Sequence, residues 1–273
     1  MVCHETYKDE DNNWFSPDEI ITVNGKKFLK NDNSKQIKVG PSESMSKSKK
    51  NTIDPEKMIE LYGADAVRLF ILSDSPPEKD VQWSDTGMMA AYKFIQKLFS
   101  LSEKIRVIGN DEKKDNYSEE ISKFTNQYLN KIERNLSNFQ YNVIIANIYE
   151  AYSFYSNIIK NNKNYSNLVE EYSKFLISIT PVVPHLSSEC LGQININNFK
   201  WPQIEEKFLI EEDVNIVVQI NGKKRGIINT KKDISEEKLM KLILDSKSFD
   251  KFLKDNKIKK HIYVKNRLIN FLV

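Results

Sequence analysis

The chain has 273 residues, of which 40% are hydrophobic and 29% are charged, a composition typical of a protein with a buried core. No apolar run approaches the roughly 18 residues of a membrane helix, and the N-terminus lacks the apolar core of a signal peptide. The two cysteines, Cys3 and Cys190, provide neither a disulfide framework nor metal-site spacing. We therefore expect a cytoplasmic protein without a membrane segment or a protein-bound metal.

The formal net charge is only +3, but the charge is distributed unevenly. Residues 214–273 contain 15 Lys and Arg against 6 Asp and Glu, whereas the rest of the chain has more acidic than basic residues. A polyanion attracted by long-range charge should favour these C-terminal residues. A solvated lysine-rich surface without a partner would give the same count, so both interpretations stay open.

The first 43 residues have a sequence pattern typical of short strands and loops. Asn24-Gly25 lies between two β-prone runs, which predicts a hairpin with a two-residue turn. After a segment rich in serine and lysine, Asp54 and Pro55 predict the start of a helix, as N-cap and first helical residue. That helix should have an apolar face and should end at Gly63. The residues expected on its apolar face are Met58, Ile59, Leu61 and Tyr62.

A second short helix is expected over residues 64–72. Asp65 and Arg68 on it are expected to be structural, pairing locally or capping the helix. A loop with two prolines then leads to Trp83.

Residues 86–200 show apolar side chains at three- and four-residue steps, which predicts four or five amphipathic helices packed as a bundle. Two long helices in this region illustrate the pattern. The repeating residues are Ile121, Phe124, Tyr128, Ile132 and Leu136 in one, and Ile144, Ile148, Tyr152, Tyr155 and Ile159 in the other. These stripes are interpreted as core.

Residues 201–213 form a polar connection, and after it the sequence pattern changes from helical periodicity to strands and turns. Asn221-Gly222 predicts a second hairpin. Asp233 and Glu236 resemble a capping box for a helix over residues 235–254, and two strands close the chain. The sequence thus predicts a small β-β-α-β-β domain over residues 214–273.

The serine-lysine segment, "SESMSKSKKNTIDPEKMIELYGADAVRLF", covers residues 42–70 and combines hydroxyls with cations ahead of a helix start. Hydroxyls and backbone N–H groups donate to phosphate oxygens, and a lysine can follow a phosphate as its geometry changes. Such a loop could clamp a triphosphate. By composition alone, an exposed turn without function is the simpler interpretation.

The spacing of the serines and lysines, and the sequence that follows them, favour a function for this loop over an exposed turn without one. "SMSKS" followed by "DPEKMIELYGADAVRLF" strongly resembles the Lys-Met-Ser-Lys-Ser region of class I aminoacyl-tRNA synthetases, and is most similar to the leucyl-tRNA synthetases. "DVQWSDTGM", "TPVVPHLSSECL" and "VVQINGKKRGII" resemble later segments of the same family. The resemblance covers nearly the whole chain.

The resemblance implies that the loop binds ATP and stabilises the departing pyrophosphate during amino-acid activation, with Mg²⁺ accompanying the ATP. The implied catalytic residue is Lys47. The implied ATP-binding residues are Ser44, Met45, Ser46, Lys47 and Ser48. Ser44 stands where the family motif has its first lysine, so either one phosphate contact is lost or another lysine, such as Lys49 or Lys50, partly substitutes for it.

The family also needs a His-Ile-Gly-His element, and neither His4, His185 nor His261 forms one. We therefore expect the C-terminal portion of a longer synthetase, unable to charge tRNA alone. The expected fold class is mixed: residues 1–85 end an α/β class I catalytic domain, residues 86–200 form an α-helical tRNA-binding bundle of the anticodon-binding type, and a small α+β domain follows.

The resemblance also implies that the bundle and the C-terminal domain contact tRNA. Lys223, Lys224 and Arg225, at the second hairpin, are the expected tRNA-binding residues. The implied partners of the intact enzyme are tRNA(Leu), ATP and leucine, and the enzyme is expected to be a monomer.

Two alternatives remain. The chain could be a portion of a related isoleucyl, valyl or methionyl enzyme, although the small C-terminal domain and "VQINGK" favour leucine. It could instead be a free-standing tRNA-binding module without catalysis. The nearly intact loop motif argues against such a module, whereas the absence of a nucleotide-binding half argues for it.

Overall fold

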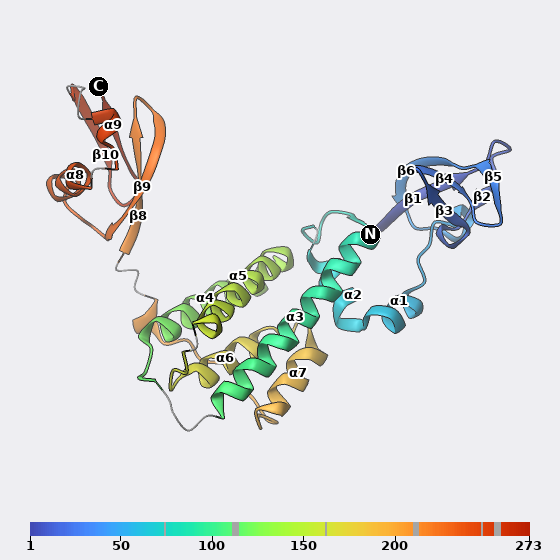
Figure 1. Cartoon of the computed structure of the whole chain (residues 1–273), viewed down its shortest axis with the longest axis horizontal. Coiled ribbons are helices and arrows are strands. Elements are labelled where there is room, and N and C mark those ends of the chain that lie inside the picture. Colours follow the sequence, from blue (N-terminus) through green and yellow to red (C-terminus); the bar gives the residue numbers. More distant parts are fainter. Residues whose placement is uncertain (74, 111–114, 162, 210–212, 247, 254–257) are drawn as a thin grey trace. The chain divides into compact units, whose positions relative to one another are not determined.

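The computed structural model describes residues 1–73, 75–110, 115–161, 163–209, 213–246, 248–253 and 258–273. The chain divides into two compact units, Met1–Glu205 and Glu206–Val273. The boundary falls inside the polar connection over residues 201–213. Strands and helices occur in both units (Figure 1), so the expected mixed class is confirmed, and no described helix is long and apolar enough to cross a membrane.

The first unit begins with strands. β1 pairs with β2 and β6 in antiparallel fashion and with β7 in parallel, while β3, β4 and β5 form a separate meander. The bounds are β1 Val2–Lys8, β2 Trp14–Phe15, β3 Ile20–Val23, β4 Lys26–Leu29, β5 Asp32–Gln36, β6 Lys38–Ser44 and β7 Val81–Gln82, with a 3₁₀ turn η1 at Pro17–Glu19. The predicted hairpin is confirmed, because Asn24 and Gly25 join β3 to β4 with φ of 50° and 77°.

Two short helices follow the serine-lysine loop: α1 Pro55–Tyr62 and α2 Ala64–Ser73. The predicted cap is confirmed, since the Asp54 carboxylate accepts a hydrogen bond from the Glu56 N–H at 3.0 Å. Gly63 ends α1 with a φ of 81°.

The apolar face predicted for α1 is only partly covered by other elements. Ile59 and Leu61 are 46% and 64% exposed, and no residue of α1 is fully buried. Only Met58 and Tyr62, one helical turn apart, are half-buried, and Tyr62 packs edge-on against Tyr92 at 5.6 Å. Periodicity predicted which residues share a face, but not whether another element covers that face.

In the described part of the chain between β7 and residue 205, the first unit is helical (Figure 1). Its helices there are α3 Asp85–Gly109, α4 Glu119–Ser137, α5 Tyr141–Lys160, α6 Leu168–Ser178 and α7 Pro184–Gln193. The apolar stripes predicted from the sequence are largely buried in one continuous core that extends from α2 to α7.

Three tyrosines lie inside this core with their hydroxyls bonded to neighbouring helices. Tyr172 bonds Ser102 at 2.7 Å, Tyr155 bonds Thr125 at 2.8 Å, and Tyr128 accepts from Ser178 at 3.2 Å. All three are at most 2% exposed. The stripes therefore combine apolar packing with hydrogen bonds that fix how the helices align.

The second unit contains a four-stranded sheet in the order β10-β11-β8-β9. Along the chain, α8 and α9 lie between β9 and β10. The bounds are β8 Asp213–Ile220, β9 Lys223–Lys231, α8 Glu236–Asp245, α9 Asp250–Leu253, β10 Lys260–Val264 and β11 Leu268–Leu272, preceded by a 3₁₀ turn η3 at Glu206–Phe208. The core packs Leu239 and Ile243 of α8 against Val218 and Phe271 of the sheet.

Two expectations for this unit are wrong. The helix expected over residues 235–254 is two helices, α8 and α9. The cap of α8 is Ser235, whose hydroxyl accepts from the Lys238 N–H, whereas Asp233 has a positive φ of 62° and binds Asn266 and Lys265. Asp233 thus fixes the loop before β11 instead of forming a capping box.

Candidate functional site

The loop that carries the candidate residues connects the end of β6 to α1. Ser44 is the last residue of β6, where it pairs with Cys3 of β1. Met45 donates its backbone N–H to the Val2 carbonyl at 3.2 Å. The backbone of the first two motif positions is therefore part of the sheet edge, and the loop leaves the sheet only after Met45.

The next residues form a tight turn, the 3₁₀ element η2 at Lys47–Lys49. The hydroxyls of Ser46 and Ser48 are 2.7 Å apart and share a hydrogen bond. Lys50 closes the turn in the left-handed region, with a φ of 52°. Ser46, Lys47 and Ser48 thus occupy one turn at the surface, with Lys47 and Ser48 exposed.

The Asn51 side chain supports this turn through hydrogen bonds. Its side-chain oxygen accepts the Ser46 N–H at 2.8 Å, and its amide nitrogen donates to the carbonyls of His4 and Glu43, each at 3.2 Å. Asn51 is fully buried, at 0% exposure. The sequence analysis missed this residue. The only signal was a polar residue in front of the Asp54 cap, and nothing in that pattern indicates burial.

The lysines of the loop differ in their partners. Lys49 forms an ion pair with Glu43 on β6. Lys47 forms no ion pair with any residue that the structure describes. Its ammonium is therefore available to an external anion, whereas Lys49 would have to leave Glu43 to replace the lysine that the motif lacks at Ser44.

This turn presents the Lys47 ammonium, which has no ion-pair partner among the described residues, and the hydroxyls of Ser46 and Ser48, all supported by the buried amide of Asn51. Charge-assisted hydrogen bonds from such groups suit the oxygens of a phosphate chain. The Lys47 side chain also keeps the rotational freedom that following a moving phosphate requires.

A second cluster ties α2 to the start of α7. The Asp65 carboxylate accepts from the backbone N–H of Leu186 at 2.7 Å and contacts His185 Nδ1 at 2.9 Å. Arg68 donates to the carbonyls of Val182 and Pro181 at 3.0 and 2.7 Å. Asp65 and Arg68 are structural, as expected, but their partners lie more than 110 residues away and not on their own helix.

The second hairpin, in the second unit, has the predicted Asn221-Gly222 turn, with φ of 49° and 76°. Lys223 and Lys224 are exposed on β9. The Arg225 guanidinium instead lies 4.4 Å from the centre of the Phe252 ring, at a bulge in β9. The bulge brings Gly226 against Phe249, where an added Cβ would approach the ring to 2.7 Å. All three basic residues are exposed, but the Arg225 guanidinium also packs against an aromatic ring.

Metal ligation has no support in the described part of the chain, where no three His, Cys, Asp or Glu side chains gather. Both cysteines are free and buried. Burial raises the pKa of the Cys190 thiol, which keeps it protonated and unreactive.

Two family models match parts of the chain. Residues 118–240 match the anticodon-binding domain of tRNA ligase, and residues 37–84 match the class I tRNA synthetases for I, L, M and V. The second match contains the whole of the loop described above. The first runs from α4 into the second unit.

Two relatives that match the whole chain are both named leucine–tRNA ligase. A leucine–tRNA ligase of Orientia tsutsugamushi is 36% identical over 281 residues, covering 100% of this chain and 33% of the relative. One from Zymomonas mobilis is 32% identical, covering 100% of this chain and 32% of the relative. The chain thus spans about a third of the length of the curated relatives it matches.

A solved structure has the same fold. It is the ternary complex of the Agrobacterium radiobacter K84 agnB2 LeuRS with tRNA and LeuAMS, which aligns with a TM-score of 0.66 at 24% identity. The alignment covers 84% of this chain and 31% of that chain.

Proposed function

Because this chain belongs to the class I aminoacyl-tRNA synthetases and is homologous over its whole length to leucine–tRNA ligases, we propose that it is the C-terminal portion of such a ligase. The intact enzyme would activate leucine with ATP and transfer it to tRNA(Leu). Residues 1–85 would end the catalytic domain, residues 86–200 would be the tRNA-binding bundle, residues 201–213 the linker, and residues 214–273 a second tRNA-contacting domain.

The observation that carries the proposal is the free Lys47 ammonium on a turn held by buried Asn51, within a segment that matches the class I model. In activation, the leucine carboxylate attacks the α-phosphorus of ATP, and the bond to the pyrophosphate oxygen breaks. Lys47 would neutralise the charge that grows on the departing pyrophosphate. A hydrogen bond to a charged group contributes roughly 1.5–3 kcal/mol, which is about ten- to a hundredfold in rate if it forms only in the transition state.

The hydroxyls of Ser46 and Ser48 would donate to the same phosphates, and Ser44 and Met45 would anchor the start of the loop to the sheet edge. Mg²⁺ would arrive with the ATP as part of the substrate, since the described residues gather no ligand set of their own. We also propose that the enzyme is cytoplasmic and monomeric.

Contact with tRNA would use both units. In the second unit, the exposed Lys223, Lys224 and Arg225 would meet the phosphates, and Arg225 would also support the hairpin through Phe252. This proposal includes steep salt dependence of tRNA binding, because neutralised phosphates release counterions.

The two alternatives make different predictions. A portion of an isoleucyl, valyl or methionyl enzyme would prefer another tRNA, and the reported relatives, all leucine–tRNA ligases, favour leucine. A free-standing module would bind tRNA without any need for Lys47. The free ammonium on a supported turn favours a catalytic role over that module.

The experiment is a hybrid enzyme in which this chain replaces the matching third of the Orientia tsutsugamushi ligase. We expect the hybrid to charge tRNA(Leu) with leucine, and the isolated chain to show no leucine-dependent pyrophosphate exchange. A hybrid that folds and charges tRNA for isoleucine, valine or methionine instead would replace the proposal by the related enzyme. A folded hybrid that binds tRNA(Leu) without charging it would favour the module.

A further inference from the structure

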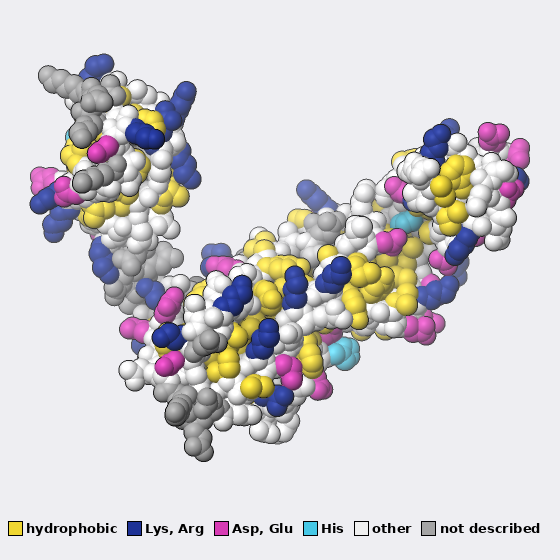
Figure 2. Space-filling view, in the orientation of Figure 1, with side chains coloured by type: hydrophobic (Ala, Val, Ile, Leu, Met, Phe, Trp, Pro, Cys, Tyr) yellow, Lys and Arg dark blue, Asp and Glu magenta, His cyan; other side chains and the backbone are white. Residues whose placement is uncertain are grey.

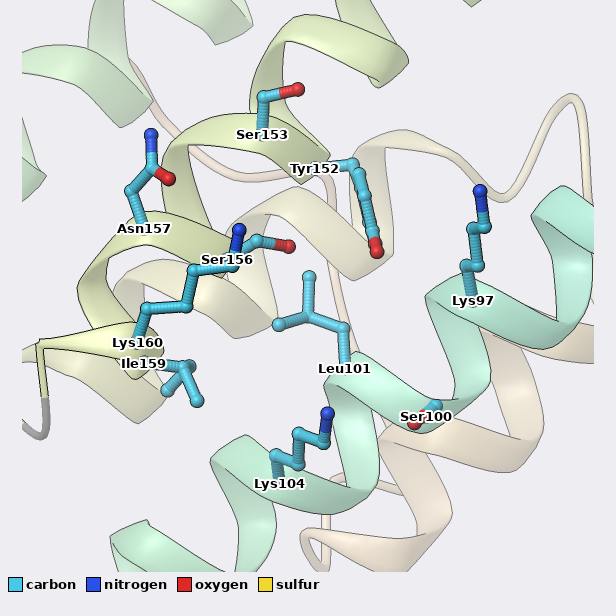
Figure 3. Close-up of a pocket in the computed structure, with 10 residues that line it drawn as sticks. All are labelled: Lys97, Ser100, Leu101, Lys104, Tyr152, Ser153, Ser156, Asn157, Ile159 and Lys160. Atoms are coloured by element: carbon cyan, nitrogen blue, oxygen red, sulfur yellow. The ribbon is translucent and has the colours of Figure 1, made fainter.

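A cationic groove of about 590 Å³ lies between α3 and α5, and Lys97, Lys104 and Lys160 are among its lining residues (Figure 3). It falls within residues 86–200, for which contact with tRNA is already proposed, so it provides no separate site. The strands that open the first unit and the sheet of the second unit instead share a feature whose chemistry the proposed function leaves unused. This feature is an Asn-Gly turn, which occurs in each of them.

The two Asn-Gly turns are nearly identical in local chemistry. Residues 23–27 read Val-Asn-Gly-Lys-Lys, and residues 220–224 read Ile-Asn-Gly-Lys-Lys. Asn24 and Asn221 have φ of 50° and 49°, the glycines that follow them have φ of 77° and 76°, and all four residues are exposed. Figure 2 shows Lys and Arg side chains on the surface of both regions. Local sequence and turn geometry therefore do not distinguish the two turns.

An Asn-Gly pair is prone to a reaction with itself, called deamidation. The backbone nitrogen of the glycine loses its proton and attacks the side-chain carbonyl carbon of the asparagine. The bond from that carbon to the amide nitrogen breaks, and the amide nitrogen takes up a proton and leaves as ammonia. Glycine favours this step because no Cβ obstructs the approach. Water then opens the resulting succinimide ring at either carbonyl, which gives aspartate or isoaspartate.

Tertiary hydrogen bonds hold the turn at Asn221. The Gly222 N–H donates to the Asn270 side-chain oxygen at 3.0 Å, and the Asn221 side-chain oxygen accepts the Val273 N–H at 3.2 Å. The Asn221 N–H also donates to the Phe271 carbonyl at 2.8 Å. The attacking nitrogen and the side-chain amide under attack are thus both bonded to β11 or to the residue after it. These bonds have to break before the turn can open.

The turn at Asn24 lacks such bonds. Within the described residues, neither the Asn24 side chain nor the Gly25 N–H has a hydrogen-bond partner. Val23, before this turn, is 43% exposed, whereas Ile220, before the other turn, is 4% exposed and belongs to the core of the second unit. The β3–β4 hairpin therefore opens at its turn with a smaller change in free energy than the β8–β9 hairpin.

We propose that Asn24 is a site of spontaneous deamidation in this chain, and that the contacts of Asn221 with β11 protect it from the same reaction. The intrinsic rates are equal because the flanking residues match, so the population of the open turn decides the difference. The product at Asn24 carries a new negative charge, and its isoaspartate form also adds a methylene group to the backbone of the hairpin. The inference goes beyond the proposed function and does not depend on it.

The test follows deamidation of the intact chain in mildly alkaline buffer. Samples taken over time are digested under acidic conditions that stop the reaction. Tandem mass spectrometry then locates the mass increase produced when a carboxyl group replaces an amide. The same measurement in concentrated urea gives the rates for the unfolded chain. There, Asn24 and Asn221 should react within about twofold of each other, because no tertiary contact remains.

In the folded chain, we expect Asn24 to react at least about tenfold faster than Asn221, because tertiary hydrogen bonds hold only the turn at Asn221. Equal rates in the folded chain would overturn the proposal, as would a faster reaction at Asn221. A folded chain in which neither site reacts, over a time in which both react in urea, would also overturn it.

Two variants test the cause of the protection. Asn270→Ala removes the acceptor of the Gly222 N–H and should speed deamidation of Asn221 at least about threefold, while Asn24 keeps its rate. The matched control, Asn229→Ala, removes another asparagine side chain of the same sheet, and both rates should stay unchanged. Circular dichroism verifies that each variant is folded. An unaltered rate at Asn221 in the folded Asn270→Ala variant would overturn the assigned protection, and the comparison of the two turns in the unaltered chain needs neither variant.

Discussion

Asn51 accepts a hydrogen bond from the backbone N–H of Ser46 at 2.8 Å, and it does so from a fully buried position. The same amide donates to the carbonyls of His4 and Glu43. One side chain thus connects the exposed turn around Lys47 to two strands of the sheet. The position of the candidate phosphate-binding group depends on a residue that would itself touch no phosphate.

Changing Asn51 to Ala should loosen the turn. The change leaves the Ser46 N–H and two carbonyls without their partner, at a cost of roughly 1–3 kcal/mol. We expect trypsin to cleave the variant after Lys47, Lys49 or Lys50 several-fold faster than the unaltered chain, as followed by mass spectrometry. The control is Asn33→Ala at an exposed position. Equal cleavage rates in all three proteins would contradict the supporting role of Asn51.

The contact between Asp65 and Leu186 should contribute to the stability of the first unit. Asp65 is only 6% exposed and caps the N-terminus of α7, so Asp65→Ala should lower the free energy of unfolding by about 1–3 kcal/mol. Urea unfolding measures the effect. Asp18→Ala, which removes only an exposed pair with Lys57, should change the free energy by less than about 1 kcal/mol. A similar small effect in both variants would show that the α2–α7 contact is dispensable.

The three core tyrosines predict how stability changes at high pH. Burial raises the pKa of Tyr128, Tyr155 and Tyr172 above the ordinary value near 10. The folded state therefore holds these protons more tightly than the unfolded state, so its stability is complete below pH 10 and falls as the pH rises further.

The measurement is tyrosinate absorbance at 295 nm during an alkaline titration. We expect at least three of the 12 tyrosines to stay protonated until the bundle unfolds. Ionisation of all 12 near pH 10, with helicity retained in circular dichroism, would contradict the buried placement of the hydroxyls.

The hairpin residues should separate into two functional kinds. Lys223→Glu and Lys224→Glu together should weaken tRNA binding and reduce its salt slope, with no change in the unfolding temperature of the chain. Arg225→Ala should also destabilise the second unit, by about 0.5–1 kcal/mol, because the exposed guanidinium loses its contact with Phe252. Circular dichroism and anisotropy on the same samples test both effects. Unaltered binding after the double charge reversal would exclude Lys223 and Lys224 from the contact.

What could be predicted from the sequence depended on local chemistry. The Asn24-Gly25 and Asn221-Gly222 turns and the Asp54 cap involve residues within a few positions of one another, and all are confirmed. The apolar stripes within residues 86–200, tyrosines included, were predicted to be core because burial of a helix face leaves a periodic pattern.

The failures came from long-range partners. Nothing near Asp65 in the sequence indicates that it caps a helix 121 residues later. Ile59 and Leu61 have the pattern of a buried face but are left uncovered, and Asn51 has the composition of a loop but is buried. The Lys47 position was predicted from a motif, whereas its Asn51 support required the folded sheet.

The central claim is that Lys47 stabilises the departing pyrophosphate. It is tested most directly by leucine-dependent ATP–pyrophosphate exchange in the hybrid enzyme, comparing Lys47→Ala with Ser44→Ala. We expect Lys47→Ala to slow exchange about ten- to a hundredfold. Ser44→Ala should stay within a few-fold of the unaltered hybrid, because the Ser44 backbone pairing with β1 does not need its side chain. Equal rates for the two variants would contradict the assignment of Lys47.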